Sequence, residues 1–263
     1  IVMNRLVKVA GIQSNPRILE KEKNLKECLE SINVASKEGA DLIVFPECSL
    51  TGYCFSSLEE ALSVAESIPG PSVEAVASLC KELGVFVVIG LVERDGDGCF
   101  NSIALLGPKG FLGKYRKLHL PYLGLDRFAS HGDLPFKVYD TELGRIGMNI
   151  CFDIHFPEII RILALLRAEI VVLPTNWPKG ADLVPKYVVN TRAYENRVHF
   201  VAVNRVGRER GFRFIGRSKI VHCSGLTLAE ASASKEEIIY AQLNPEDSRE
   251  KHVVIKKNEF ELS

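Results

Sequence analysis

The chain has 263 residues, 46% of them hydrophobic, and its 33 basic and 33 acidic side chains leave no formal net charge. The length and apolar fraction fit one globular domain with a substantial core, and the balanced charge argues against a nucleic-acid-binding protein. Seven cysteines with irregular spacing, and no stretch typical of a signal peptide or membrane span, predict free thiols in the cytoplasm.

Hydrophobic periodicity organises the first half of the chain. It predicts a strand over 6–12, a helix over 20–37 and a buried strand over 41–45. A second helix is expected over 72–83, between Pro71 and Gly84. The continuously apolar stretch 85–91 is typical of a strand covered on both faces, and turn signals at 95–98 and 107–110 bracket a strand over 99–106.

The second half alternates strands with helices. Strands are predicted over 144–150, 170–173, 198–203 and 215–221, with 238–243 as an edge strand and helices over 159–167 and 181–196. Because hairpin signals interrupt the alternation, two mixed sheets covered by helices fit better than one doubly wound sheet. We expect a single domain over 1–263. Its polar, basic tail, 248–263, contains apolar residues at 253–255 and 260 and is predicted to dock at a subunit interface.

Three polar side chains are candidates for chemistry because each follows a predicted strand. Cys151 ends the apolar run 145–150 at a strand-to-helix turn, where free backbone N–H groups can hold an oxyanion. Glu47 follows the strand 41–45, and Lys117 lies in a basic segment after a strand-like pair at 111–112. The alternatives are a buried structural cysteine, a surface carboxylate and a solvated lysine.

Taken together, the segments around these residues resemble the nitrilase superfamily of carbon–nitrogen hydrolases. The motifs P-E-x-x-x-x-G-Y at 46–53, Y-R-K-x-H-L at 115–120 and C-F-D-x-x-F-P-E at 151–158 occur in the order typical of that family. Further similar segments lie at 174–178, 192–197, 204–207 and 214–229, so the resemblance covers nearly the whole chain. It implies an α/β fold, a four-layer α-β-β-α sandwich of two mixed sheets, assembled as a homodimer or larger homo-oligomer.

The resemblance also implies a Glu-Lys-Cys triad. Cys151 would attack the carbonyl carbon and form a thioester, Glu47 would act as general base and acid, and Lys117 with the backbone N–H of Phe152 would hold the oxyanion. The charge of Glu47 disfavours a thiolate at Cys151 whereas that of Lys117 favours it. No cofactor is implied, and without an H-E-x-x-H or paired Cys/His pattern no metal site is predicted. We expect His119, His155 and His199 to be structural.

Three departures from the family pattern bear on the substrate. Many amidase-type members carry a second glutamate after the lysine motif, but residues 121–133 contain none, and Asp126 is the candidate replacement. His131 and His155 stand where the family usually has proline and arginine. Tyr53 and Trp177 are the other candidate substrate-binding residues, although a packing role fits Trp177 equally well.

The most favoured function is hydrolysis of a small carboxamide. Phe152 and Asp153 after the cysteine resemble amidase branches, whereas nitrile-hydrolysing branches typically show Trp-Glu there. The close alternative is an N-carbamoyl amine hydrolase with the same triad. A nitrile hydrolase and a non-catalytic binding subunit are less favoured. The expected partners are a small amide or ureido substrate and copies of the same chain, with no nucleic acid and no membrane.

Overall fold

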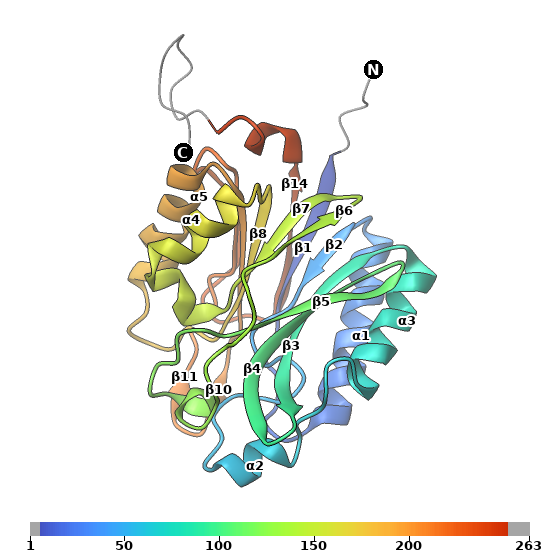
Figure 1. Ribbon diagram of the computed structural model, residues 1–263, viewed down its shortest axis with the longest axis vertical. Coiled ribbons are helices and arrows are strands. Elements are labelled where there is room, and N and C mark those ends of the chain that lie inside the picture. The colour runs from blue at the N-terminus through green and yellow to red at the C-terminus, as the bar shows by residue number, and fades with distance from the viewer. Residues whose placement is uncertain (1–5, 252–263) are drawn as a thin grey trace.

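Two six-stranded mixed sheets form the centre of the protein in a computed structural model that describes residues 6–251 (Figure 1). The first sheet has the order β14-β1-β2-β3-β4-β5, with β1, β2 and β3 parallel. Its strands are β1 (Val7–Gln13), β2 (Leu42–Val44), β3 (Phe86–Asp95), β4 (Gly98–Gly107), β5 (Gly110–Arg116) and β14 (Glu237–Leu243).

The second sheet has the order β13-β12-β9-β8-β7-β6, with β7, β8 and β9 parallel. A separate two-stranded hairpin joins β10 (Arg208–Glu209) to β11 (Phe212–Arg213). The strands of the second sheet are β6 (Val138–Thr141), β7 (Gly144–Met148), β8 (Ile170–Thr175), β9 (His199–Asn204), β12 (Lys219–Val221) and β13 (Thr227–Glu230).

Helices cover the outer faces of both sheets. Figure 1 shows α1 (Lys21–Lys37) and α3 (Pro71–Leu83) on one side of the molecule, and α4 (Pro157–Leu165) and α5 (Val189–Asn196) on the other. A short helix α2 (Leu58–Leu62) lies at one end. Single helical turns complete the described chain: η1 (Gly124–Arg127), η2 (Cys151–His155), the π-type η3 (Val184–Val188) and η4 (Pro245–Ser248).

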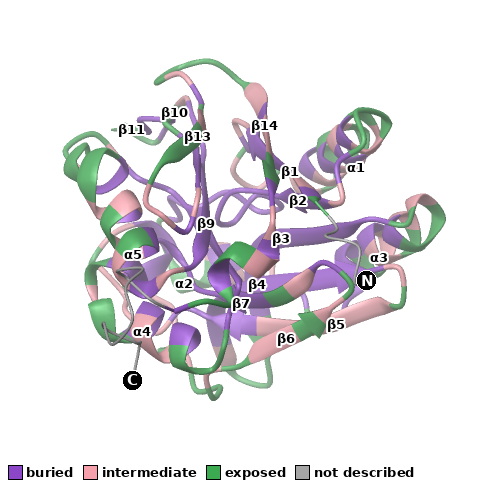
Figure 2. Ribbon diagram, turned by 90° about the horizontal axis from the view of Figure 1, so that it is seen from above, coloured by how far each residue is buried: buried purple, intermediate pink, exposed green. Residues whose placement is uncertain are grey.

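Buried apolar side chains explain the layers. Ile32 of α1 and Val76 of α3 belong to one cluster with Ile43 and Val87 from the outer face of the first sheet. The inner faces of both sheets share another, larger cluster, and Figure 2 shows the central strands buried while the helices are exposed on their outer sides. The predicted α-β-β-α sandwich of two mixed sheets is therefore confirmed.

Some element boundaries differ from the predictions. The strand expected over 215–221 is reduced to β12, because Gly216 and Arg217 have φ of 57° and 56° and cannot continue an extended strand. The helix expected over 181–196 consists of η3 followed by α5, with Pro185 in the first turn of η3. Several short strands and a helix lacked a clear sequence signal, among them α2, β6, β10, β11 and β13.

The last described residues lie against the second sheet. The Lys251 ammonium is buried and donates to the carbonyls of Ala168 and Arg197, and the Ser248 hydroxyl donates to the Glu169 carbonyl. Most of the predicted docking tail, including its apolar residues, lies outside the described residues. Within 6–251, none of the helices combines the length and apolar character required to cross a bilayer.

Candidate active site

Glu47 occupies a tight turn after β2, where its side chain is fully buried. The turn passes directly over Gly90 of β3: a Cβ at that position would lie 2.6 Å from the Cys48 nitrogen and 2.9 Å from the Pro46 carbonyl. The Asn176 side chain, from the end of β8, donates to the Glu47 carbonyl over 3.0 Å. Gly90 of the first sheet therefore lets the Glu47 turn pack closely on β3, and Asn176 from the second sheet holds the Glu47 backbone.

Lys117 follows β5 and is also fully buried, which excludes the solvated lysine. Its backbone N–H donates to the Asn101 carbonyl of β4, so the side chain leaves the end of the first sheet in a fixed direction. The ammonium donates to Glu47 Oε1 over 2.7 Å and to Asp126 Oδ2 over 2.5 Å. One cation thus contacts two carboxylates.

The side chain of the neighbouring Arg116 is directed away from that of Lys117. It is buried and donates to Glu93, Asp95 and Asp133, while its guanidinium lies 3.8 Å from the centre of the Phe100 ring. Asp133 is thereby engaged away from Lys117. Arg116 supports the fold next to the site, but its charged group does not face Glu47.

Asp126, on η1, has its carboxylate in the same cluster. Its Oδ2 accepts the Tyr53 hydroxyl over 2.7 Å as well as Lys117, and its Oδ1 accepts from the Asn101 amide over 2.8 Å. Gly124, with φ of 53°, permits this approach because a Cβ there would lie 2.6 Å from the Tyr53 ring. Tyr53 and Asp126 are therefore brought together with Glu47 and Lys117.

Cys151 begins η2 after β7, with φ of 44°. A non-glycine residue rarely adopts this conformation, so the sharp turn predicted from the sequence is present. Thr175 and Asn176 come from the end of the adjacent parallel strand β8.

Electrostatics at Cys151 oppose a resident thiolate. Burial and the nearby charge of Glu47 raise the pKa of the thiol, while Lys117, the Thr175 hydroxyl and the Asn176 N–H lower it by a smaller amount. The sulfur therefore rests as a thiol, and its proton must leave as it attacks. An adjacent base is required for that step.

The carboxylates and the lysine influence one another. Burial raises the pKa of Glu47; Asp126 also raises it, while Lys117 and Asn101 lower it. Burial opposes the charge of Lys117, but Asp126 and Glu47 outweigh burial and raise the pKa of the ammonium well above its ordinary value. Lys117 stays charged, and Glu47 is a stronger base than an exposed glutamate.

Phe152 directly follows Cys151, and Trp177 comes two residues after the end of β8. Trp177 is buried in the cluster that contains Cys151, its backbone N–H donates to Asn204 Oδ1, and its indole nitrogen lacks a partner in the described chain. Phe152 is partly buried and packs edge-on against Phe156. The structure places Trp177 in the core, but its unpaired indole N–H leaves a donor available.

Sequence reasoning missed Asn101 and Cys48. The Asn101 amide donates to Glu47 Oε1 over 2.6 Å and to Asp126 Oδ1, and its oxygen accepts from the Cys48 thiol over 3.5 Å. The available signal was an amide side chain in the largely apolar strand 99–106, because a buried amide requires partners.

The three histidines expected to be structural differ in burial. His199 is buried, donates from Nε2 to the Asn244 carbonyl and accepts the Cys223 N–H at Nδ1. His222 and Cys223 come within 4.8 Å of it, yet both His199 nitrogens are already engaged, so a metal would have to displace a hydrogen bond. His119 is half-buried against Asp153, and His155 is exposed.

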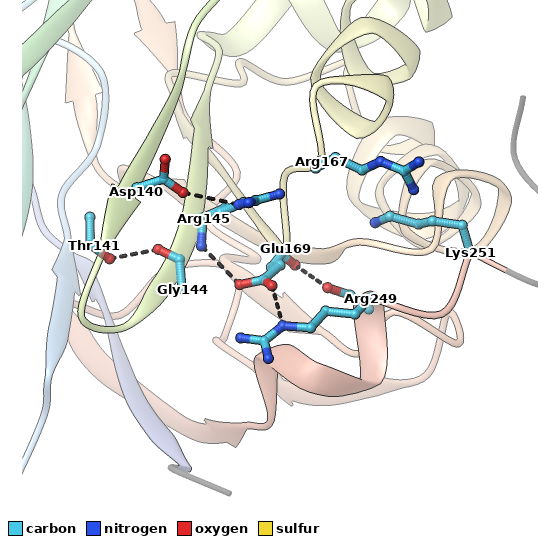
Figure 3. A pocket seen from close by; sticks show the side chains of 9 residues that line it. Asp140, Thr141, Gly144, Arg145, Arg167, Glu169, Arg249 and Lys251 are labelled. Carbon is cyan, nitrogen blue, oxygen red and sulfur yellow. Dashed lines mark hydrogen bonds and ion pairs between the residues drawn. The ribbon is translucent and has the colours of Figure 1, made fainter. Parts of the chain in front are cut away.

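A cavity of about 400 Å³ lies away from this cluster, among side chains that include Arg145, Arg167, Glu169 and Lys251 (Figure 3). Gly144 begins β7 and Glu169 directly precedes β8, whereas Cys151 and Thr175 lie beyond or at the other ends of these strands. The cavity therefore lies at the N-terminal ends of β7 and β8, whereas the buried thiol lies at their C-terminal ends.

The fold is thus an α-β-β-α sandwich in which Glu47, Lys117 and Cys151 are all buried. A family model for carbon-nitrogen hydrolases matches residues 8–252, and the chain belongs to this family, the nitrilase superfamily. A nitrilase of Pyrococcus abyssi is 42% identical over 242 residues, covering 91% of this chain and 90% of that protein. An omega-amidase of Bos taurus is 32% identical over 241 residues, covering 85% and 84%.

The solved structures agree with the fold. The crystal structure of Saccharomyces cerevisiae Nit3, a member of branch 10 of the nitrilase superfamily, superposes with a TM-score of 0.82 at 26% identity, covering 93% of this chain and 92% of that one. The resemblance inferred from the three motifs is thus confirmed at the level of family and fold.

Proposed function

We propose that this protein hydrolyses a small carboxamide to a carboxylate and ammonia through a thioester on Cys151. The observation that carries the proposal is the buried cluster in which Lys117 contacts both Glu47 and Asp126 next to the thiol. Glu47 Oε1 accepts from Lys117 and Asn101, whereas Glu47 Oε2 has no partner in the described chain. That free oxygen is suited to accept the thiol proton.

The first half of the reaction forms the thioester. Cys151 sulfur bonds to the substrate carbonyl carbon as its proton passes to Glu47. The resulting oxyanion is held by the Lys117 ammonium and the Phe152 N–H. The intermediate collapses, the carbon–nitrogen bond breaks, and Glu47 returns the proton to the departing nitrogen, so that ammonia leaves.

The second half hydrolyses the thioester. Glu47 takes a proton from a water molecule as the water oxygen bonds to the acyl carbon. Lys117 and the Phe152 N–H hold the second oxyanion. The carbon–sulfur bond breaks, Glu47 returns the proton to the sulfur, and the carboxylic acid leaves. Asp126, the candidate replacement for the missing second glutamate, keeps Lys117 in place and charged, and the Tyr53 hydroxyl fixes Asp126.

A homo-oligomer is the second part of this proposal. Exposed apolar side chains gather around η3, α5 and the turn before β13: Leu183, Tyr187, Tyr194 and Leu226. Asn190 of α5 donates to the Gly225 carbonyl, which ties the turn to the helix. Light scattering of the purified protein tests the dimer or larger assembly; a monomer at assay concentration would contradict it. Cytoplasmic localisation remains a prediction.

The test of function is ammonia and carbon dioxide release across matched carboxamides, ureido compounds and nitriles. We expect ammonia without carbon dioxide from carboxamides. Equal release of both gases from ureido compounds would identify the carbamoylase instead, and turnover confined to nitriles would contradict the amidase. Cys151→Ala, which removes only the sulfur, is the control for every substrate.

A further inference from the structure

Asn101 joins the two carboxylates of the cluster. It lies in β4, between β3 and β5, and is buried. One hydrogen of its amide is directed to Glu47 Oε1 at 2.6 Å and the other to Asp126 Oδ1 at 2.8 Å. The backbone carbonyl of the same residue accepts the Lys117 N–H at 2.8 Å. A single residue therefore contacts all three charged members of the cluster.

The orientation of the Asn101 amide is determined by its surroundings. The Cys48 thiol donates to Oδ1, so the oxygen faces a donor while the nitrogen faces two anions. Rotating the amide by 180° would point its oxygen at Glu47 and Asp126 and leave both carboxylates short of a donor, which is costly in a buried site. The observed arrangement satisfies every polar atom of the Asn101 side chain.

The balance of charges in the cluster shows why the hydrogen bonds from Asn101 are needed. Lys117 supplies one positive charge, whereas Glu47 and Asp126 supply two negative charges, and all three side chains are fully buried. Every contact that the two carboxylates make with side chains comes from a donor: Lys117, Asn101 or Tyr53. Buried carboxylates in excess over cations tend to take up a proton unless hydrogen bonds stabilise them.

We propose that Asn101 is a positioning residue that holds Glu47 and Asp126 around one lysine and reserves Glu47 Oε2 for the thiol proton. This inference rests on the proposed function. Because Asn101 and Lys117 both bind Oε1, the carboxylate is turned so that Oε2 is its only oxygen without a partner in the described chain. Without the amide, Glu47 would lose a donor and the fixed rotation of its carboxylate.

The other titratable groups that face Glu47 are the same in the parent protein and in an Asn101 variant. They are Lys117 after β5, Asp126 on η1, Cys151 on η2 and the adjacent Cys48 and Tyr53; Glu209 of β10 bonds the backbone of Tyr53 and is paired with Arg205. Asn101 lowers the pKa of Glu47, in agreement with the geometry. Its removal leaves all of these charges in place.

The main test replaces Asn101 by leucine, which is similar in size but donates no hydrogen bond. Loss of a donor to the charged form raises the pKa of Glu47, so the acid limb of kcat/KM should move upward by about one pH unit. Activity should fall most at low pH and recover partly as the pH rises. Asn101→Ser, which keeps one hydroxyl donor in a smaller side chain, should show a smaller shift and serves if the leucine variant does not fold.

A matched control is Asn24→Leu. Asn24 is also a buried asparagine whose amide donates twice, but to the carbonyls of Arg17 and Leu50 rather than to carboxylates. Its loss should lower stability without moving the acid limb. If the Asn101 variants lose activity equally at all pH values, with the limb unmoved as in the control, Asn101 is only structural and the inference is wrong.

A second readout does not depend on turnover. The carboxyl ¹³C resonance of Glu47, identified by its disappearance in Glu47→Gln, can be titrated in the parent protein and in the Asn101 variants. We expect a higher midpoint in the variants; an unchanged midpoint overturns the inference. If the parent protein and Cys151→Ala release ammonia equally slowly from all substrates, the proposed function fails, while this titration still decides the role of Asn101.

Discussion

Replacing Asp126 by asparagine removes one of the two negative charges around Lys117 with little change in shape. Asp126 accepts hydrogen bonds from Lys117, Tyr53 and Asn101. An asparagine can keep its oxygen toward Lys117 and Tyr53, but its NH₂ then faces the NH₂ of Asn101. One buried donor is left unpaired, at a cost of about 1–3 kcal/mol. A domain with typical stability of about 5–15 kcal/mol should still fold.

The kinetic effect of Asp126→Asn should be larger than the structural one. Lys117 loses one of its two anionic partners, so its position is less defined, and we expect kcat/KM to fall by about 10- to 1000-fold. Because Asp126 raises the pKa of Glu47, its removal should move the acid limb to lower pH, opposite to the shift expected for Asn101→Leu.

Steady-state kinetics from pH 4 to 9, urea unfolding and alkylation of Cys151 by iodoacetamide separate these effects. Cys151 should still be alkylated in Asp126→Asn. Unchanged kcat/KM together with an unmoved acid limb would refute the assignment of Asp126, and a residue of the Trp177 region or of a neighbouring subunit would then have to complete the site.

Two further variants probe the lysine and a buried histidine. Lys117→Met should lower kcat by about 100-fold or more, as loss of an oxyanion donor does. Arg116→Met should lower stability by about 1–3 kcal/mol, because Glu93 loses that partner but keeps Lys114 and Ser102, and kcat of the folded fraction should be near normal. Equal kinetic damage in both variants would contradict the assignment. Burial lowers the pKa of His199 to about 4, so the unfolded chain, with a histidine pKa near 6.5, binds the extra proton between these values. The neutral His199 side chain therefore contributes about 3 kcal/mol to the free energy of unfolding above pH 6.5, and this contribution is lost as the pH falls toward 4. In His199→Gln, the free energy of unfolding in urea should depend less on pH between 6.5 and 4. The same pH dependence in the variant and the parent protein would contradict this reasoning.

The layers of the fold could be predicted because each element has a regular apolar pattern. The run over 85–91 and the helix face with Ile32 show this clearly, and both are buried where expected. The shorter strands could not be predicted in the same way. β13 is largely exposed and β6 partly so, since they are edge strands with few apolar contacts to impose a pattern.

The candidate site shows a similar division. Glu47, Lys117 and Cys151 follow strands and lie in recognisable motifs, so they could be selected from the sequence. Asn101 could not, because its role depends on two carboxylates that are 54 and 25 residues away in the chain. The burial of Arg116 could not be predicted either, since Glu93 and Asp133 approach it only in the folded protein.

The central claim is that Cys151 carries the acyl group during turnover. Acid quenching within the first turnovers on a carboxamide, followed by intact-mass measurement and peptide mapping, tests it most directly. Cys48 provides an internal comparison, because it is a buried thiol beside Glu47 whose own pKa burial raises. We predict a mass increase equal to the substrate acyl group less the thiol hydrogen, located on the peptide with Cys151 and absent from Cys151→Ala, which should fold normally but release no ammonia. Acyl transfer to Cys48, or ammonia release by Cys151→Ala at the parent rate, would contradict the account.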